Sequence, residues 1–323
     1  MITPSGSEGF ERSEKSEPGL LAIRDPAHRP HAHADWRERL ELLRAELERC
    51  ARVVVAYSGG VDSSLLLAVA HERLGDRALG VIGVSDSYAA HELDLALAQA
   101  ARIGARVETV TTGELADPVF ASNPLERCYH CKRELYSRLA EVAAREEAAI
   151  WANPGATSAA AAGAASPRAS VVVMDGTIAD DLADWRPGRK AAAERAVRSP
   201  LAELGFGKAD VRAAAASLGL ESAPKPASPC LASRIPYGTA ITRERLEQVE
   251  RAEALLRELG FSELRVRHHG ETARIEVPLG DVPRLVAPGV REQVTCGFRA
   301  LGFRWVTLDL DGFRSGSLNP PGA

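Results

Sequence analysis

Short apolar runs alternate with helical patterns over the first two thirds of the chain. The runs have the length of buried strands and predict β-strands at residues 53–57, 78–84, 106–110 and 171–174. Apolar residues that recur every three or four positions predict helices at 36–50, 61–74, 92–103 and 132–148. Strands that alternate with helices in this way favour a parallel sheet covered by helices on both faces, an α/β fold.

The pattern changes at about residue 223. A proline-rich stretch leads to an amphipathic helix at 243–259, followed by strands at 263–267 and 274–277, a helix at 290–301 and a strand at 304–308. This order predicts a small α+β domain at 223–312 after an α/β domain at 36–222. Polar sequence at 1–35 predicts a disordered leader, Ala-Gly-Ser-Pro-rich sequence at 151–169 predicts a surface insertion, and 313–323 forms a tail.

Composition limits the class of partner. The 323 residues carry a net charge of −4, which gives no global attraction to nucleic acid. No apolar stretch has the form of a signal peptide or a bilayer-spanning helix. We therefore expect a cytoplasmic protein with a small-molecule partner. Since five cysteines are an odd number in a reducing compartment, a disulfide framework is not expected.

A glycine- and serine-rich loop joins the first predicted strand to the next helix. Two glycines allow a sharp turn, and serine hydroxyls add to the free N–H groups of a helix start, which together suit an anion. The loop lacks the lysine of a Walker A motif and resembles the pyrophosphate loop of enzymes that split ATP into AMP and pyrophosphate. The alternative is an ordinary Gly-Ser turn. The residues predicted to bind ATP here are Ser58, Gly59, Gly60, Asp62, Ser63 and Ser64.

Other predicted strands end in polar residues that should reach the same crevice. The carboxyl ends of parallel strands meet at one edge of a sheet, where Asp175, Gly176 and Thr177 would join the loop and contact the nucleotide. Asp62, Asp180 and Asp181 are candidate ligands of Mg²⁺, which prefers oxygen. The alternative for each acid is a helix-start residue that balances the helix dipole.

Three cysteines are candidates for metal chemistry. Cys128 and Cys131 form a Cys-x-x-Cys pair at a helix start, where Arg127 and Lys132 are expected to favour thiolates. Cys230 lies on the proline-rich segment and could fold back over the crevice. Three thiolates would hold a [4Fe–4S] cluster with one iron left open. Zinc with His130 or Cys296 as a fourth ligand, a redox pair and two buried thiols are the alternatives.

These motifs together resemble the LarE family of ATP-dependent sulfur transferases, from about residue 36 to 310. That family makes the nickel-pincer nucleotide by converting carboxylates of a pyridinium mononucleotide into thiocarboxylates. The chain departs from the family's pattern at Ile178, where the family would place Asn. The resemblance implies ATP, Mg²⁺, a small nucleotide substrate and a homo-oligomer. It rests on the Ser58 loop, residues 127–132, Asp175-Gly176-Thr177 with Asp180-Asp181, residues 186–188 and residues 229–238.

The resemblance also implies residue roles. Cys230 becomes the sulfur-handling residue. In members with that cysteine alone, the enzyme gives up its own sulfur and ends as dehydroalanine; in members with the Cys-x-x-Cys pair, three cysteines hold a [4Fe–4S] cluster with a labile sulfide. This chain has all three, so the cluster route is preferred, with sacrifice of Cys230 as the second route.

The predicted substrate site lies in the second domain. Arg265 and Arg267 stand two residues apart on a predicted strand, so both can face one phosphate. This agrees with the substrate site of the family, which also involves Ser233, Arg234, Glu253 and Glu276. The alternative is a solvated strand face, and His268 and His269 are interpreted as exposed loop residues.

Three rival functions share part of the pattern. An enzyme that thiolates tRNA would share the loop and the cysteines, but it should carry a basic face with interleaved aromatics, and aromatics are only 5% of this chain. An ammonia-using synthetase of the NAD or GMP type would have no use for Cys230. A nucleotide-binding sensor would need neither the cysteine pair nor the acids.

Overall fold

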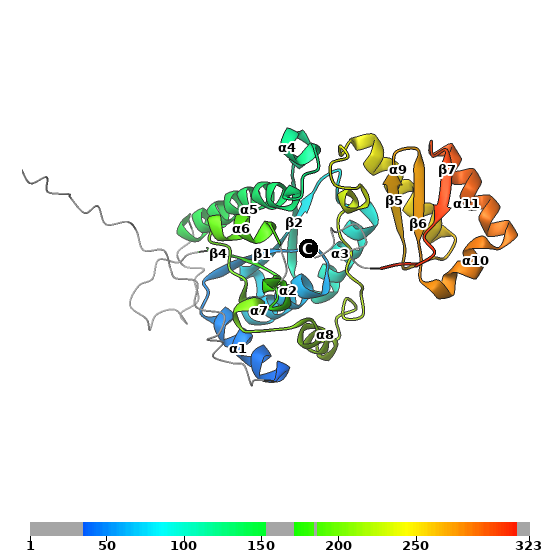
Figure 1. The fold of residues 1–323 in the computed structure, drawn as a ribbon. Helices are drawn as coiled ribbons and strands as arrows, with labels where there is room; N and C mark the ends of the chain where they lie inside the picture. Colours follow the sequence, from blue (N-terminus) through cyan, green and yellow to red (C-terminus); the bar gives the residue numbers. More distant parts are fainter. Residues whose placement is uncertain (1–34, 153–170, 184–185, 315–323) are drawn as a thin grey trace, which may run out of the picture. The chain divides into compact units, whose positions relative to one another are not determined.

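A four-stranded parallel sheet forms the centre of the first part of the chain (Figure 1). The computed structural model describes residues 35–152, 171–183 and 186–314. The strands are β1 (Arg52–Ala56), β2 (Ala78–Val84), β3 (Arg106–Thr111) and β4 (Val171–Asp175), in the order β3-β2-β1-β4. All neighbours pair in parallel, which confirms the predicted sheet.

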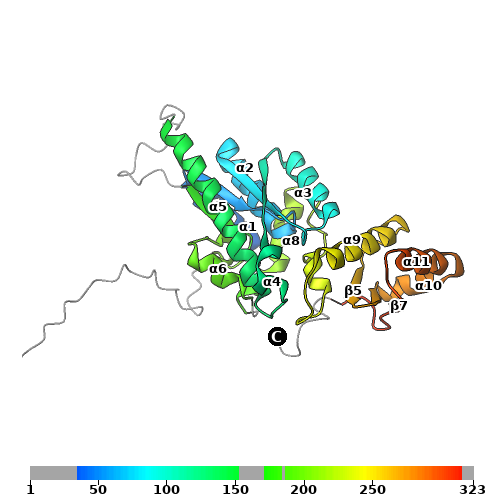
Figure 2. The same ribbon diagram turned by 90° about the horizontal axis from the view of Figure 1, so that it is seen from above.

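Helices cover both faces of this sheet, as Figures 1 and 2 show. Helices α1 (Trp36–Glu48), α2 (Val61–Leu74), α3 (Ala90–Ile103) and α8 (Lys208–Ser217) contribute to one apolar core. Helices α5 (Arg127–Ala152) and α6 (Gly188–Glu194) contribute to a second core on the other face. The two cores confirm the α/β class. Helix α5 begins five residues before its predicted start, so the cysteine pair lies within its first turns.

The strand order creates a crevice at the carboxyl end of β1. The chain passes from β1 to β2 on one side, and β4 pairs on the other side, with Ala56 opposite Asp175. Connections that leave in opposite directions open a space above the strand ends, where ligands of such sheets bind. The Ser58 loop and the Asp175 turn are the two segments at this point.

A second, three-stranded sheet follows in the order β5-β6-β7. Strands β5 (Arg265–His269) and β6 (Thr272–Glu276) are antiparallel, and β7 (Trp305–Leu308) pairs in parallel with β6. Helices α9 (Arg243–Glu258) and α11 (Pro288–Ala300) pack against it. The α+β composition is confirmed, whereas the boundary between the two domains stays a prediction.

The position of β5 corrects one sequence expectation. The strand begins and ends two residues later than predicted, so His268 and His269 are strand residues and not loop residues. His268 is 2% exposed and its Nε2 lies 3.0 Å from Oε1 of Gln248 on α9. Two adjacent histidines look polar in a sequence, but one of them faces the core because strand side chains alternate between faces.

Several short elements connect the main ones and were not predicted. The short helices are η1 (Gly75–Arg77), η2 (Glu114–Ala116), α4 (Pro118–Ala121), η5 (Asp180–Leu182), α7 (Pro200–Glu203), η6 (Leu231–Arg234), η7 (Leu279–Asp281) and α10 (Val282–Val286).

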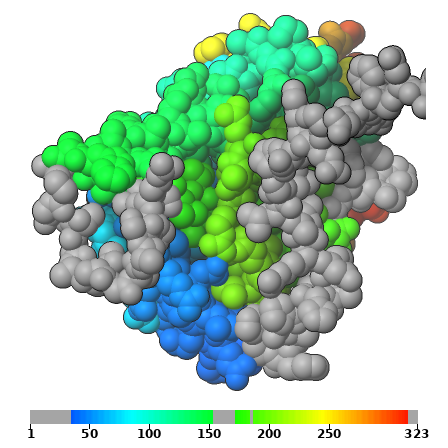
Figure 3. Space-filling model, turned by 90° about the vertical axis from the view of Figure 1, so that its left-hand side faces the viewer, coloured from blue at the N-terminus to red at the C-terminus, as the bar shows by residue number. Residues whose placement is uncertain are grey.

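Figure 3 shows one face of the molecule, with α1 in blue at the bottom and α5 in green at the upper left. Of the helices that the structure describes, none is long and apolar enough to cross a bilayer.

The predicted leader (apart from residue 35), most of the insertion and residues 315–323 of the tail lie outside the described residues. The amide of Phe313, at the start of the predicted tail, donates to the carbonyl of Val277 after β6 (2.9 Å).

Candidate functional site

The loop after β1 has the geometry of an anion site. Gly60 is the N-cap of α2, so the first N–H groups of that helix have no partner within it. Gly59 adopts φ +67°, and a side chain there would place Cβ 2.5 Å from Cβ of Ala96 on α3. The hydroxyl of Ser63 accepts from the amide of Ser58 (3.2 Å) and folds the loop over the helix start. The loop therefore presents backbone donors in the way that phosphate requires.

The turn after β4 lies directly against this loop. A Cβ on Gly176 would stand 2.8 Å from the amide nitrogen of Ser63, so only glycine allows this approach. Asp175 accepts hydrogen bonds from the hydroxyls of Tyr136 (2.7 Å) and Ser199 (2.7 Å) and from the amide of Thr177 (3.1 Å). These bonds fix the turn, because a buried carboxylate is costly unless it is satisfied.

One cavity of about 700 Å³ brings the predicted motifs together. Its wall includes the Ser58 loop, the Asp175 turn, two of the three cysteines and the arginines of β5. The predicted site residues that line it are Ser58, Gly60, Asp62, Ser63, Cys128, Asp175, Gly176, Thr177, Asp181, Cys230, Ser233, Arg265 and Arg267.

Positive charge prevails on the wall of this cavity. Among the described residues that line it, seven side chains are cationic and three are carboxylates. A wall of this kind attracts an anionic ligand, as nucleotides are. The cationic residues are Arg127, Lys132, Arg186, Arg189, Arg265, Arg267 and Arg314, and the acids are Asp62, Asp175 and Asp181.

The predicted magnesium ligands differ in what they contact. Both oxygens of Asp62 accept from Nζ of Lys208 (2.8 and 2.7 Å), and Asp181 pairs with Arg186 (2.8 Å). Burial raises the pKa of Asp181, and the negative charge of Asp62 contributes in the same direction. Asp180 does not line the cavity and accepts from the amide of Lys208 (2.7 Å). Asp62 and Asp181 are thus the pair that could share a cation beside bound phosphates.

The three cysteines lie near one another. Cys128 and Cys230 both line the cavity, while Cys131 and Cys230 pack against the same apolar cluster, which contains Leu231. They are close enough for a charge on one to raise the pKa of another: Cys230 acts in this way on Cys128 and on Cys131, and Cys128 acts on Cys131. The expectation that Arg127 and Lys132 would favour thiolates is wrong for the free protein. Desolvation is the main cause that raises the pKa of both thiols, and it outweighs Arg127 and Lys132 at Cys128 and Lys132 at Cys131.

The alternative ligands for zinc are engaged elsewhere. His130 Nδ1 lies 3.2 Å from the carboxylate of Asp117, and Cys296 lies on α11 and does not line the cavity. Within residues 35–152, 171–183 and 186–314, no three His, Cys, Asp or Glu side chains surround one point as ligands of a single metal ion. A [4Fe–4S] cluster takes one thiolate on each of three separate irons, so it does not require such a point.

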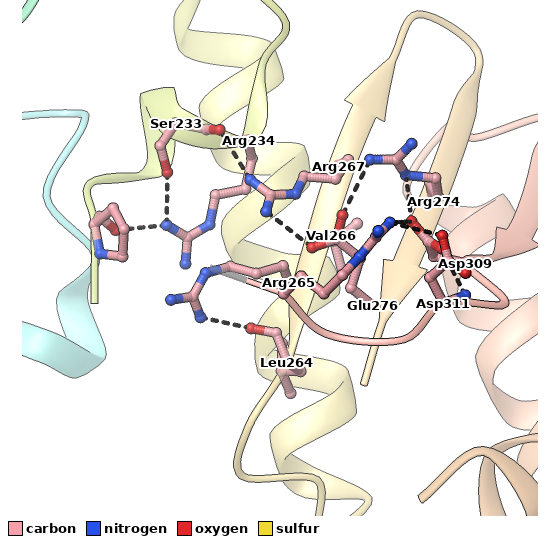
Figure 4. A network of polar contacts seen from close by, with 12 residues as sticks. Ser233, Arg234, Leu264, Arg265, Val266, Arg267, Arg274, Glu276, Asp309 and Asp311 are labelled. Atoms are coloured by element: carbon pink, nitrogen blue, oxygen red, sulfur yellow. Dashed lines mark hydrogen bonds and ion pairs between the residues drawn. The ribbon is translucent and has the colours of Figure 1, made fainter. Parts of the chain in front are cut away.

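The arginines of β5 reach the cavity from the second sheet (Figure 4). Arg267 donates to the carbonyl of Ser233 (3.1 Å) and pairs with Glu276 (2.8 Å). Arg265 donates to the carbonyls of Leu264 and Ala227 (both 2.7 Å). Burial lowers the pKa of Arg265 to about 10, with the charge of Arg234 as the second cause. Among the described residues, Arg265 forms no salt bridge.

Arg234, Glu253 and Glu276 do not line the cavity, unlike Ser233. Arg234 is 2% exposed, and its guanidinium pairs with the fully buried Glu253 (2.9 and 3.1 Å). The same guanidinium donates to the carbonyls of Pro229 and Cys230 and so holds the cysteine segment. Direct contact with substrate stays a prediction for these three residues, which in this geometry position Cys230 and Arg267.

Comparison with known proteins decides the family. No family model matches the chain. It is 40% identical over 276 residues to the pyridinium-3,5-bisthiocarboxylic acid mononucleotide synthase of Lactiplantibacillus plantarum, a match that covers 85% of this chain and 91% of that protein. The chain belongs to the LarE family. It is also 43% identical over 281 residues to an uncharacterized protein of Synechocystis sp., covering 87% of this chain and 97% of that protein.

Ile178, where this LarE-family chain departs from the family's pattern, is a core residue. Ile178 is 1% exposed, belongs to the first apolar core and does not line the cavity. A polar side chain at this position would need a partner inside the core. The contacts of Asp175 do not involve it.

Three residues that connect the LarE motifs were not predicted from the sequence. Lys208 pairs with Asp62, and Lys225 pairs with Glu92 (2.7 Å) while its Nζ also contacts the carbonyl of Gly59 (3.4 Å). Asn123 contacts both of the segments that carry the cysteines. Nothing in the local sequence marks these residues, because each acts on a segment far away in the chain.

The raised pKa of Cys128 predicts a pH-dependent reactivity. At neutral pH the group is a thiol, and the thiolate forms only as the pH rises above the ordinary value near 9. We expect alkylation of Cys128 by iodoacetamide to be slower at pH 7.5 than that of an unstructured cysteine peptide and to increase through pH 10. Mass spectrometry of the modified peptide measures the rate. Alkylation that is as fast as that of the peptide at pH 7.5 would contradict the raised pKa of Cys128.

Proposed function

We propose that the chain is an ATP-dependent sulfur transferase that converts the carboxylates of pyridinium-3,5-biscarboxylic acid mononucleotide into thiocarboxylates for the nickel-pincer cofactor. The relative from Lactiplantibacillus plantarum bears the name of the enzyme that makes the bisthiocarboxylate product. The observation that carries the proposal is that the phosphate loop, two cysteines and the arginines of β5 line one cavity.

The first step would activate the carboxylate. The loop at Ser58–Gly60 would hold the phosphates of ATP, and Asp62 and Asp181 would hold Mg²⁺ against them. An oxygen of the substrate carboxylate attacks the α-phosphorus, and pyrophosphate leaves. The acyl adenylate that results has AMP as a leaving group, which a carboxylate lacks.

The substrate mononucleotide would lie between the loop and β5. Arg265 and Arg267 supply positive charge at this end of the cavity, and a phosphate is the group of the substrate that needs it. Of the two arginines, Arg265 is better suited to bind that phosphate, because Glu276 already neutralises the charge of Arg267. Ser233 lies beside them and offers a hydroxyl.

Sulfur would enter through the cysteines. Cys128, Cys131 and Cys230 would hold a [4Fe–4S] cluster, since Cys128 and Cys230 line the cavity and Cys131 and Cys230 pack against one apolar cluster. When bound, that cluster would supply a labile sulfide. Arg234 would keep Cys230 directed to the cavity, and ligation itself would release the thiol protons, since a metal binds the thiolate.

A second route uses Cys230 itself. Its thiolate attacks the acyl adenylate and expels AMP, which leaves a thioester. Removal of the Cα proton then breaks the bond between Cβ and sulfur, so the substrate departs as a thiocarboxylate and residue 230 becomes dehydroalanine. This route needs no oxidant, and each protein molecule can use it once.

Product analysis of ATP tests the first step. We expect AMP and pyrophosphate to form only when the carboxylated mononucleotide is present, because the loop has no lysine of the kind that assists γ-phosphate transfer. Asp62→Asn should slow this reaction by about tenfold or more through the loss of a charged ligand. The control is Asp94→Asn, on the exposed side of α3. ADP as the main product, or full activity of Asp62→Asn, would contradict the proposal.

The same assay separates the rival enzymes. A tRNA-thiolating enzyme would form AMP with unmodified tRNA as the acceptor, and a synthetase of the NAD or GMP type would need ammonia. We expect neither acceptor to support AMP formation.

A further inference from the structure

Asn123 occupies an unusual position between the two segments that carry the cysteines. It follows α4 and precedes α5, its side chain is fully buried, and its φ is +59°. A residue other than glycine rarely adopts this conformation, although asparagine tolerates it better than most. A strained, buried polar residue of this kind persists only where its contacts stabilise it.

The side-chain amide of Asn123 binds the segment after Cys230. Its Nδ2 donates to the carbonyls of Ile235 (3.2 Å), Pro236 (2.8 Å) and Thr239 (3.0 Å). The main-chain carbonyl of Asn123 accepts a hydrogen bond from the amide of Gly238 (2.9 Å). One residue thus satisfies several backbone groups of a segment more than a hundred positions away.

The other end of the same amide binds the start of α5. Oδ1 of Asn123 accepts from Nη1 of Arg127 (2.6 Å), and Arg127 is the residue directly before Cys128. The guanidinium of Arg127 also lies over the ring of Tyr237, 4.5 Å from its centroid. The two ends of one side chain therefore connect the Cys128 segment with the Cys230 segment.

We propose that Asn123 is a positioning residue that sets the separation of Cys128 and Cys131 from Cys230. A side-chain amide has two N–H donors and one carbonyl acceptor, so it can bond to the carbonyls of residues 235–239, with one N–H shared between two of them, and to a guanidinium at the same time. The use of the three thiols in sulfur transfer rests on the proposed function, whereas their placement by Asn123 does not.

Two substitutions separate the roles of the amide and of the backbone. Asn123→Gly permits the positive φ and removes both polar ends. Asn123→Asp keeps the shape and the acceptor for Arg127, but it replaces the donor with an oxygen that faces three carbonyls. The matched control is Ser122→Ala, since Ser122 is the exposed neighbour and its hydroxyl contacts only the carbonyl of Val119.

The test measures thiol proximity in the full-length, metal-free protein. A short bifunctional thiol reagent should join Cys128 to Cys230, and mass spectrometry of the joined peptides gives the yield at a fixed time. We expect the cross-link yield to fall by about tenfold in both Asn123 variants and to stay at the wild-type value in Ser122→Ala. A tenfold change corresponds to the free energy of one or two net hydrogen bonds. Binding of a non-hydrolysable ATP analogue should be unchanged in all three.

An unchanged cross-link yield in both Asn123 variants would overturn the proposal. Loss of ATP-analogue binding together with the cross-link would also overturn it, because Asn123 would then support the fold in general. The protein could also show the cross-link, lose it in Asn123→Gly and yet transfer no sulfur. That result would support the placement of the cysteines by Asn123 and refute the proposed function.

Discussion

Cys230→Ala is expected to abolish sulfur transfer and to leave ATP binding intact. Cys230 lies on the cavity wall, and the amide of the next residue, Leu231, donates to the carbonyl of Ser87 in the turn after β2 (2.8 Å). The Cys230 side chain forms no hydrogen bond to another described residue, so its removal should not displace the segment. Loss of the sulfur-bearing group should reduce turnover by about 10³-fold or more.

Thiocarboxylate formation measured by mass spectrometry checks this effect, with Cys296→Ala on α11 as the control. Cys128→Ala and Cys131→Ala then separate the two routes of sulfur delivery. If a cluster delivers sulfur, each of them is inactive and lacks the anaerobic brown chromophore. If Cys230 is sacrificed, both remain active for one turnover, and Cys230 of the wild type loses the mass of one hydrogen sulfide. Full activity of Cys230→Ala would contradict both routes.

Arg234→Ala should be the most destabilising single change at the site. It would leave Glu253, which is fully buried, without its main partner, and removal of one partner of a buried pair costs about 3–5 kcal/mol. The loss of stability should lie near the lower end of this range, because Arg257 (3.0 Å) and the amide of Val266 (3.1 Å) also contact Glu253. Chemical denaturation measures the free energy of unfolding.

An exposed pair provides the control for this prediction. Arg138→Ala removes contacts with Glu134 and Glu141 on the surface of α5 and should cost at most about 1 kcal/mol. The double variant Arg234→Met, Glu253→Leu should recover most of the stability but not sulfur transfer, since the carbonyls of Pro229 and Cys230 would still lack their donor. Equal losses in Arg234→Ala and Arg138→Ala would show that the buried pair has no special role.

Local patterns were sufficient to predict the framework of this site. The apolar run before Ser58 and the helical pattern after it predicted a strand, a loop and a helix, and the structure has all three. Parallel pairing then places Asp175 beside the loop without further information, because the strand ends of such a sheet share one edge. The two-residue spacing of Arg265 and Arg267 likewise predicted that both would reach one face of β5.

The contacts that join distant segments could not be predicted. Asn123 looks like a turn residue before a proline, and its role depends on carbonyls at residues 235–239. Glu253 and Glu276 look like surface acids in amphipathic patterns, yet each is buried by an arginine from another element. The cysteine pair was expected to be ionised from its neighbours in sequence, but burial by tertiary packing decides its pKa.

The most direct test of the account is the reaction itself. The full-length protein, reconstituted anaerobically with iron and sulfide, is incubated with ATP, Mg²⁺ and pyridinium-3,5-biscarboxylic acid mononucleotide, and the products are identified by mass spectrometry. The account predicts replacement of a carboxylate oxygen by sulfur, with one AMP released for each carboxylate converted. Cleavage of ATP without any thiocarboxylate, or thiolation of tRNA in place of the mononucleotide, would contradict it.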